Sequence, residues 1–178
     1  VGGITSKNIT PLLLDGLKRL EYRGYDSSGL VILSQDNKLM RERAAGKVSN
    51  LENNLKLKKP SLKGNVGLAH TRWATHGKPS VNNAHPHISK NSISVVHNGI
   101  IENYIDLKDL QIKQGYEFTS ETDTEVIAHA IESAIKPSDS LLKATQKVLK
   151  TLNGSYGIGV LSSKYPDQII AARKGSPL

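Results

Sequence analysis

The sequence contains no cysteine, and this absence excludes several kinds of chemistry. Within these 178 residues there is no disulfide, no thiol nucleophile and no zinc site of the cysteine-containing types. Aromatic residues are scarce, with one tryptophan, one phenylalanine and six tyrosines. No apolar run approaches the eighteen or so residues that a membrane span needs, so we expect no membrane partner. The opening VGGITSK lacks the features of a signal peptide, which favours a cytoplasmic protein.

The formal net charge of +8 raises the question of a nucleic-acid partner. Such a partner needs basic side chains that are clustered and interleaved with aromatic rings. Here the lysines are scattered, and their densest group, residues 56–63, is typical of a solvated linker. We therefore predict one soluble domain, long enough to bury a core, without a nucleic-acid partner.

Hydrophobic periodicity predicts strands and helices in groups rather than in strict alternation, which indicates an α+β fold. Thr10 is expected to cap the first helix and Gly24 to end it, and Thr122 with Glu125 to form a capping box on a later helix. A hairpin is expected to turn around residues 165–167. The expected helices run over 10–23, 101–110, 122–135 and 141–152, and the expected strands over 1–4, 29–33, 39–43, 66–70, 93–96, 155–161 and 168–172.

Five of the six histidines fall between His70 and His97, which suggests a metal site as one possibility. Zinc needs three or four converging ligands, usually with a carboxylate or carbonyl behind each imidazole. No Asp or Glu lies between His70 and Glu102, and Arg72 beside the histidines would repel a cation. We therefore expect neither a metal nor another cofactor, although a histidine metalloprotein and a hydrogen-bonded polar core layer stay as alternatives.

Three features near the histidines indicate a pocket for an amino acid. Arg72 follows a strand with a small-residue face and could grip a carboxylate through two parallel hydrogen bonds, although a simple salt bridge is the commoner use. Asn98 and Gly99 occupy an expected strand-to-helix turn, and an amide beside an unhindered glycine N–H offers the two donors of an oxyanion hole. Asp123, at a helix start, could compensate the helix dipole or receive an ammonium group.

Five sequence blocks follow one another along the chain: LEYRGYDSSG (20–29), AHTRWATHG (69–77), NAHPH (83–87), VVHNGIIEN (95–103) and SETDTEVIAH (120–129). In one register, they resemble the glutaminase domain of the glutamine–fructose-6-phosphate aminotransferases, which are class II glutamine amidotransferases. The resemblance runs from Val1 to Leu178, and the tyrosines in LEYRGYDS favour this group over the amidotransferases of purine synthesis.

The resemblance implies a four-layer αββα sandwich of the N-terminal-nucleophile hydrolase type and hydrolysis of glutamine to glutamate and ammonia for glucosamine-6-phosphate synthesis. It implies a cysteine nucleophile three residues before Val1, so residues 1–178 are expected to be a glutaminase domain truncated at both ends. The sugar-isomerase domains, which bind fructose 6-phosphate, are expected to be absent, and the full-length protein to be a cytoplasmic homodimer.

The resemblance also implies a role for particular side chains. Arg72 is expected to bind the α-carboxylate of glutamine and Asp123 its α-amino group, with Asn98 and Gly99 as the oxyanion hole. Further expected pocket residues are Thr75 and His76 in the wall, Arg23 in a closing loop and Trp73 as the gate of an ammonia channel, with His85, His87 and His97 organising the walls. A catalytically silent glutamine-binding module remains the alternative from another class.

Overall fold

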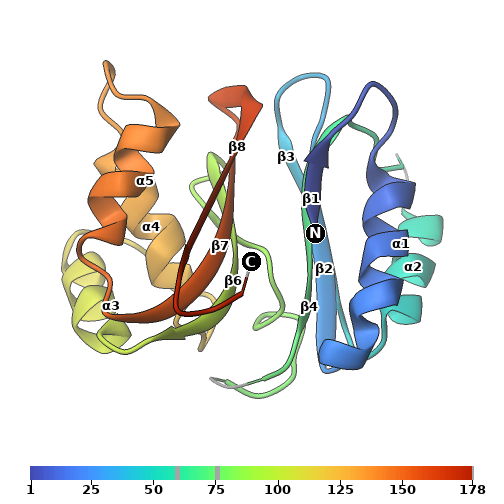
Figure 1. Cartoon of the computed structure of the whole chain (residues 1–178), viewed down its shortest axis with the longest axis horizontal. Coiled ribbons are helices and arrows are strands. Elements are labelled where there is room, and N and C mark those ends of the chain that lie inside the picture. Colours follow the sequence, from blue (N-terminus) through green and yellow to red (C-terminus); the bar gives the residue numbers. More distant parts are fainter. Residues whose placement is uncertain (59–60, 75–76, 178) are drawn as a thin grey trace.

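The structure, a computed structural model, describes residues 1–58, 61–74 and 77–177. Figure 1 shows four layers: helices, a sheet, a second sheet and further helices. Both sheets are antiparallel, with strand order β1-β4-β2-β3 in the first sheet and β5-β6-β7-β8 in the second. The predicted α+β class and four-layer sandwich are therefore confirmed.

The elements of the first sheet and its covering helices come from the N-terminal part of the chain. Their bounds are β1 Gly2–Ile4, α1 Thr10–Leu20, a 3-10 turn Glu21–Arg23, β2 Ser27–Leu33, β3 Leu39–Ala45, α2 Val48–Leu57 and β4 Val66–Arg72. The second sheet and its helices follow, as β5 His87–Ser89, β6 Ile93–Ile101, α3 Tyr104–Lys113, α4 Glu125–Ala134, α5 Leu141–Leu149, β7 Gly154–Ser162 and β8 Tyr165–Lys174.

Three apolar clusters hold the layers together. One packs α1 and α2 against the first sheet, and another packs α3, α4 and α5 against the second sheet. The third lies between the sheets and includes Val31, Leu68, Val96 and Leu161. Strand β4 shows how the sequence assigns its faces, because Leu68 joins the cluster between the sheets while Ala69 joins the cluster beneath the helices. The small-residue face predicted for this strand therefore packs against α1.

Several local predictions were wrong. Thr10 is the first residue of α1 rather than its cap, and its N–H and hydroxyl donate to Asn8 Oδ1. Gly24 does end the helical stretch, as predicted, but α1 stops at Leu20, the last turn is 3-10, and Gly24 is extended, with φ of −177°. The turn of the last hairpin lies at residues 163–164, because residues 165–167 already belong to β8.

The predicted capping box before α4 was also wrong. Helix α4 begins at Glu125, and the carboxylate of Glu125 accepts the N–H groups of Thr119 and Ser120 in the loop ahead of it. The hydroxyl of Thr122 lies 3.0 Å from His87 Nε2 instead of capping the helix. Helix α2 and strand β5 were not predicted at all, since α2 has a short, lysine-containing pattern and β5 has only three residues.

Candidate active site

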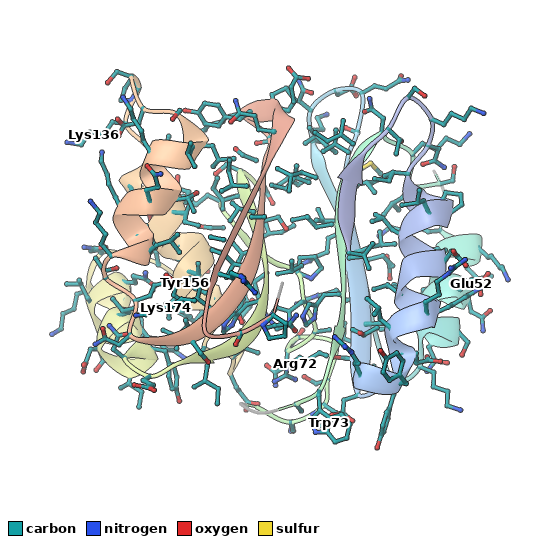
Figure 2. The ribbon with its side chains drawn as sticks, viewed as in Figure 1. Glu52, Arg72, Trp73, Lys136, Tyr156 and Lys174 are labelled. Carbon is teal, nitrogen blue, oxygen red and sulfur yellow. The ribbon has the colours of Figure 1, made fainter. Side chains whose placement is uncertain are left out.

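A pocket of about 380 Å³ lies where the ends of β4 and β6 face each other, and it brings most of the predicted site residues together. Arg72, Trp73, Arg23, Asn98, Gly99 and Asp123 all line it, together with Val1 and three of the histidines. Figure 2 shows Arg72 between the two sheets and Trp73 at the lower edge of the molecule. Thr75 and His76 lie outside the described residues, so their predicted places stay untested.

Arg72 is the last residue of β4 and only 4% exposed. Its Nη2 donates to the carbonyl of Gly77 at 3.2 Å, which ties the end of the strand to the loop beyond it. Burial lowers the pKa of the Arg72 guanidinium, while the carboxylates of Asp123, Asp26 and Glu121 raise it. An arginine keeps its charge under such conditions, so the pocket contains a buried cation suited to a carboxylate.

Asp123 lies two residues before α4 and is 4% exposed. Its Oδ2 accepts the backbone N–H of Ile101 at 2.8 Å, and its Oδ1 accepts the hydroxyl of Thr124 at 3.4 Å. Nδ1 of His97 is 3.8 Å from Oδ1. These contacts hold a carboxylate at a fixed place in the same pocket as Arg72, so the pocket carries both signs of charge.

Asn98 and Gly99 lie within β6 and not in a turn, because that strand continues to Ile101. The predicted strand-to-helix turn was therefore wrong at these residues, although α3 does follow three residues after the strand ends. Gly99 pairs with Tyr156 of β7 and has a φ of +127°. A Cβ at this position would lie 2.1 Å from the carbonyl oxygen of Ser155, so both the backbone angle and the close strand require glycine.

Trp73 and Arg23 form part of the rim of the pocket. Trp73 is 58% exposed, and its ring meets that of Tyr25 edge-on at 5.5 Å. The segment after Trp73 is held by Asp26, whose Oδ2 accepts the N–H of Ala74 at 2.8 Å. Arg23, in the 3-10 turn, donates from Nε to the hydroxyl of Tyr22 at 3.1 Å. The rim therefore joins two chain segments that are about fifty residues apart.

The buried histidines form a polar layer at the wall of the pocket, and Thr124 contacts two of them. The hydroxyl of Thr124 is 2.7 Å from His85 Nε2 and 3.0 Å from His97 Nδ1. Burial lowers the pKa of His85 and His87 well below the usual histidine value, so both rings are neutral near pH 7. His85 and His97 line the pocket, whereas His87 contacts Thr122 behind it.

Sequence reasoning missed Thr124 and the contact between His70 and Asn98. His70 Nε2 lies 2.9 Å from Oδ1 of Asn98, across the space between the two sheets. The sequence had one signal for Thr124, its position directly after Asp123, but nothing local could show which histidines it meets. Among the residues that the structure describes, no group of three or more His, Cys, Asp or Glu side chains is arranged to hold a metal ion.

Comparison with known proteins shows which family the chain belongs to. A family model described as "Glutamine amidotransferase domain" matches residues 70–176, which include Arg72, Asn98, Gly99 and Asp123. The chain belongs to the glutamine amidotransferase domain family. The resemblance predicted from the sequence blocks is thereby confirmed at the level of the family.

The curated relatives are longer enzymes. The chain is 52% identical over 178 residues to the glutamine–fructose-6-phosphate aminotransferase (isomerizing) of Pseudomonas putida, covering all of this chain and 29% of that enzyme. It is 53% identical to the enzyme of the same name from Acinetobacter baylyi, covering 28% of it. This amidotransferase domain therefore spans less than a third of the relatives' length, which means that they contain further domains.

Two solved structures share the fold at lower identity. The glutamine phosphoribosylpyrophosphate amidotransferase of B. subtilis, solved with ADP and GMP, superposes with a TM-score of 0.79 at 25% identity, over 97% of this chain and 36% of that one. A structure described as the allosteric regulatory enzyme of purine biosynthesis gives a TM-score of 0.76 at 28% identity, over 92% of this chain and 34% of that one.

None of the helices in the described part of the chain has the length and the apolar character that a membrane span requires.

Proposed function

We propose that this chain is the glutaminase domain of a glutamine–fructose-6-phosphate aminotransferase and hydrolyses glutamine to glutamate and ammonia. The observation that carries the proposal is the single pocket that a buried guanidinium, a buried carboxylate and the Asn98–Gly99 pair line together. Glutamine has a carboxylate, an ammonium and a reactive amide, and this pocket offers a partner for each.

We assign the groups of the pocket by their chemistry. Arg72 binds the α-carboxylate through charge-assisted hydrogen bonds. Asp123, held by the Ile101 N–H, receives the α-ammonium group. Asn98 and Gly99 stabilise the oxyanion that forms when the side-chain amide is attacked, which is where preorganised donors lower the barrier. Arg23 belongs to a loop that closes over the pocket, Trp73 is the gate of an ammonia channel, and Thr75 and His76 contribute to the wall.

The nucleophile that we propose is a cysteine three residues ahead of Val1. Val1 and Ala69 exchange backbone hydrogen bonds at 2.9 and 2.7 Å, and Gly2 pairs with Leu68. Extended upstream, this register sets a residue three positions before Val1 opposite Arg72, at the same end of the sheet as the pocket. That arrangement supports a thiolate that attacks the glutamine amide carbon.

The reaction then balances with water as the second substrate. The thiolate adds to the amide carbon, the tetrahedral intermediate expels ammonia, and a thioester remains. Water attacks the thioester, releases glutamate and returns the thiol. A terminal cysteine can use its own α-amine as the base, because its reference pKa of about 7.7–8.0 is near working pH.

The acceptor of the ammonia belongs to the rest of the full-length protein. We propose that sugar-isomerase domains bind fructose 6-phosphate and receive the ammonia, as the names of the curated relatives suggest for those enzymes. We also propose that the full-length protein is a cytoplasmic homodimer. Sedimentation of the purified protein and fractionation of the cells that make it test these two points.

Glutamate release by the full-length protein tests the proposal directly. We expect turnover of glutamine that rises when fructose 6-phosphate is present, together with the formation of an amino sugar phosphate. A matched protein with the proposed cysteine changed to alanine should bind glutamine without turnover. Glutamine binding without turnover by the unchanged protein would instead identify a silent binding module.

A further inference from the structure

We propose that His70 is a positioning residue that determines which end of the Asn98 amide faces the pocket. This inference rests on the oxyanion role proposed for Asn98. His70 lies on β4 in the first sheet and Asn98 on β6 in the second, so their 2.9 Å contact joins the two sheets at the pocket. His70 therefore acts on the reacting atoms through Asn98.

The contact assigns a proton to one nitrogen of His70. Oδ1 of an asparagine amide accepts hydrogen bonds and cannot donate them, so His70 Nε2 must be the donor. Burial lowers the pKa of His70 to about 4, so the ring is neutral at working pH and carries a single proton. Nδ1 of His70 is buried without a hydrogen-bond partner among the described residues. A bare lone pair there costs less than an orphaned N–H, which again places the proton on Nε2.

Asn98 itself needs such a partner. Its side chain is exposed to the pocket, so packing does not select between the two orientations of the amide. The last torsion of asparagine is broad and roughly two-fold, and the two ends of the amide have nearly the same shape. Some other interaction must decide which end of Asn98 faces the substrate.

The His70 N–H makes that choice. With Oδ1 bound to His70, the NH₂ group of Asn98 is the end left for the pocket, where it can donate to a developing oxyanion. In the flipped orientation, the NH₂ group would face the His70 N–H donor to donor. The amide oxygen would then face the site where negative charge develops and would repel it. The same hydrogen bond thus prevents the harmful orientation and favours the useful one.

Three variants of the full-length protein test the role. His70→Phe keeps a ring but removes the donor, and we expect kcat for glutamate release to fall at least 10-fold while KM for glutamine changes less than about 2-fold. Loss of a whole oxyanion donor, about 10²–10³-fold in kcat, is the upper limit. His70→Gln supplies an N–H at a similar reach and should restore most of the turnover. His129→Phe is the matched control, because His129 is a buried histidine that does not line the pocket. Its Nδ1 lies 2.9 Å from the hydroxyl of Ser89, and the kcat of this variant should stay at the parent value.

A double-mutant cycle with Asn98→Ala separates the two proposals. If His70 acts through Asn98, His70→Phe should change kcat less than 2-fold in the Asn98→Ala background. An unchanged kcat for Asn98→Ala alone would overturn the proposed oxyanion hole. If Asn98→Ala lowers kcat, two results would overturn only the positioning role. One is full activity of His70→Phe, and the other is a kcat of the double variant that falls by the product of the two single effects.

A direct measurement of the tautomer covers the case in which His70→Phe does not fold. Nitrogen NMR of the full-length protein with ¹⁵N-labelled histidine should show His70 protonated at Nε2 and bare at Nδ1 at pH 7. The resonance of His70 is assigned by its loss in His70→Gln. Protonation at Nδ1 would mean that Asn98 presents its NH₂ group to His70, and this would overturn the inference.

Discussion

Replacing Gly99 by alanine should destabilise the fold strongly, because two separate costs add at this position. The φ of +127° is a conformation that costs an L-residue about 1–3 kcal/mol. The new Cβ would also lie 2.1 Å from the backbone oxygen of Ser155, on a strand that is paired with β6 and cannot withdraw freely. Relieving such an overlap typically costs a further 1–3 kcal/mol or so.

Gly115→Ala is the matched control for this prediction. Gly115 also has a positive φ, +87°, but a Cβ there would have no heavy atom within 4 Å. It should therefore lose only the backbone contribution, about 1 kcal/mol. The two costs at Gly99 sum to about 2–6 kcal/mol, so we expect Gly99→Ala to lose about 1–5 kcal/mol more than Gly115→Ala. Each kcal/mol corresponds to about 2–4 °C in Tm for a chain of this size.

Thermal and urea unfolding of both variants, followed by circular dichroism, measure this difference. Equal losses for Gly99→Ala and Gly115→Ala would refute the reasoning, since the close approach of Ser155 would then have no energetic consequence.

Three other predictions concern the pocket. Asn98→Ala in the full-length protein should lower kcat for glutamate release by about 10²–10³-fold with little change in KM. The control is Asn50→Ala, because Asn50 on α2 is also an exposed asparagine with a single side-chain hydrogen bond. This control should leave the steady-state kinetics unchanged. Arg72→Lys keeps the charge but loses the paired donors, so KM for glutamine should rise at least about 10-fold in the same assay, and an unaltered KM would contradict carboxylate binding by Arg72. Because the folded-state pKa of His70, about 4, lies below the unfolded value of about 6.5, unfolding binds a proton between these pH values. The free energy of unfolding should therefore fall as pH drops from 6.5 to 4, by about 3 kcal/mol from His70, and urea titrations of His70→Gln should show a shallower fall.

The sequence predicted the layers of the fold better than their junctions. Strand β4 was recognisable because its apolar and small residues alternate, and that alternation is set by which layer each face meets. Strand β2 was recognisable as a continuous apolar run, because both of its faces are buried. Helix α2 was missed because its three asparagines, one glutamate and one lysine obscure a short buried stripe that includes Val48 and Leu51. Its helical form depends on packing against the first sheet, and packing is not visible in local sequence.

The site shows the same division between local and distant information. Arg72, Asn98 and Asp123 were selected by residue type and neighbours, and the structure places all three in one pocket. The continuation of β6 through Gly99 was not predicted, because an Asn-Gly pair normally signals a turn and its strand pairing with β7 lies over fifty residues away. The contact of His70 with Asn98 likewise depends on how two sheets face each other, and no local pattern records that.

Because both sheets line the pocket, a bound amino acid contacts both and links the two halves of the sandwich. Arg72 enters from the first sheet and Asn98 from the second, so a ligand that touches both resists any sliding of one half of the molecule over the other. Glutamate should consequently protect the whole domain from heat, by about 2.7 kcal/mol at a hundred times its Kd. Protection of this kind should also extend to amides in strands that never touch the ligand.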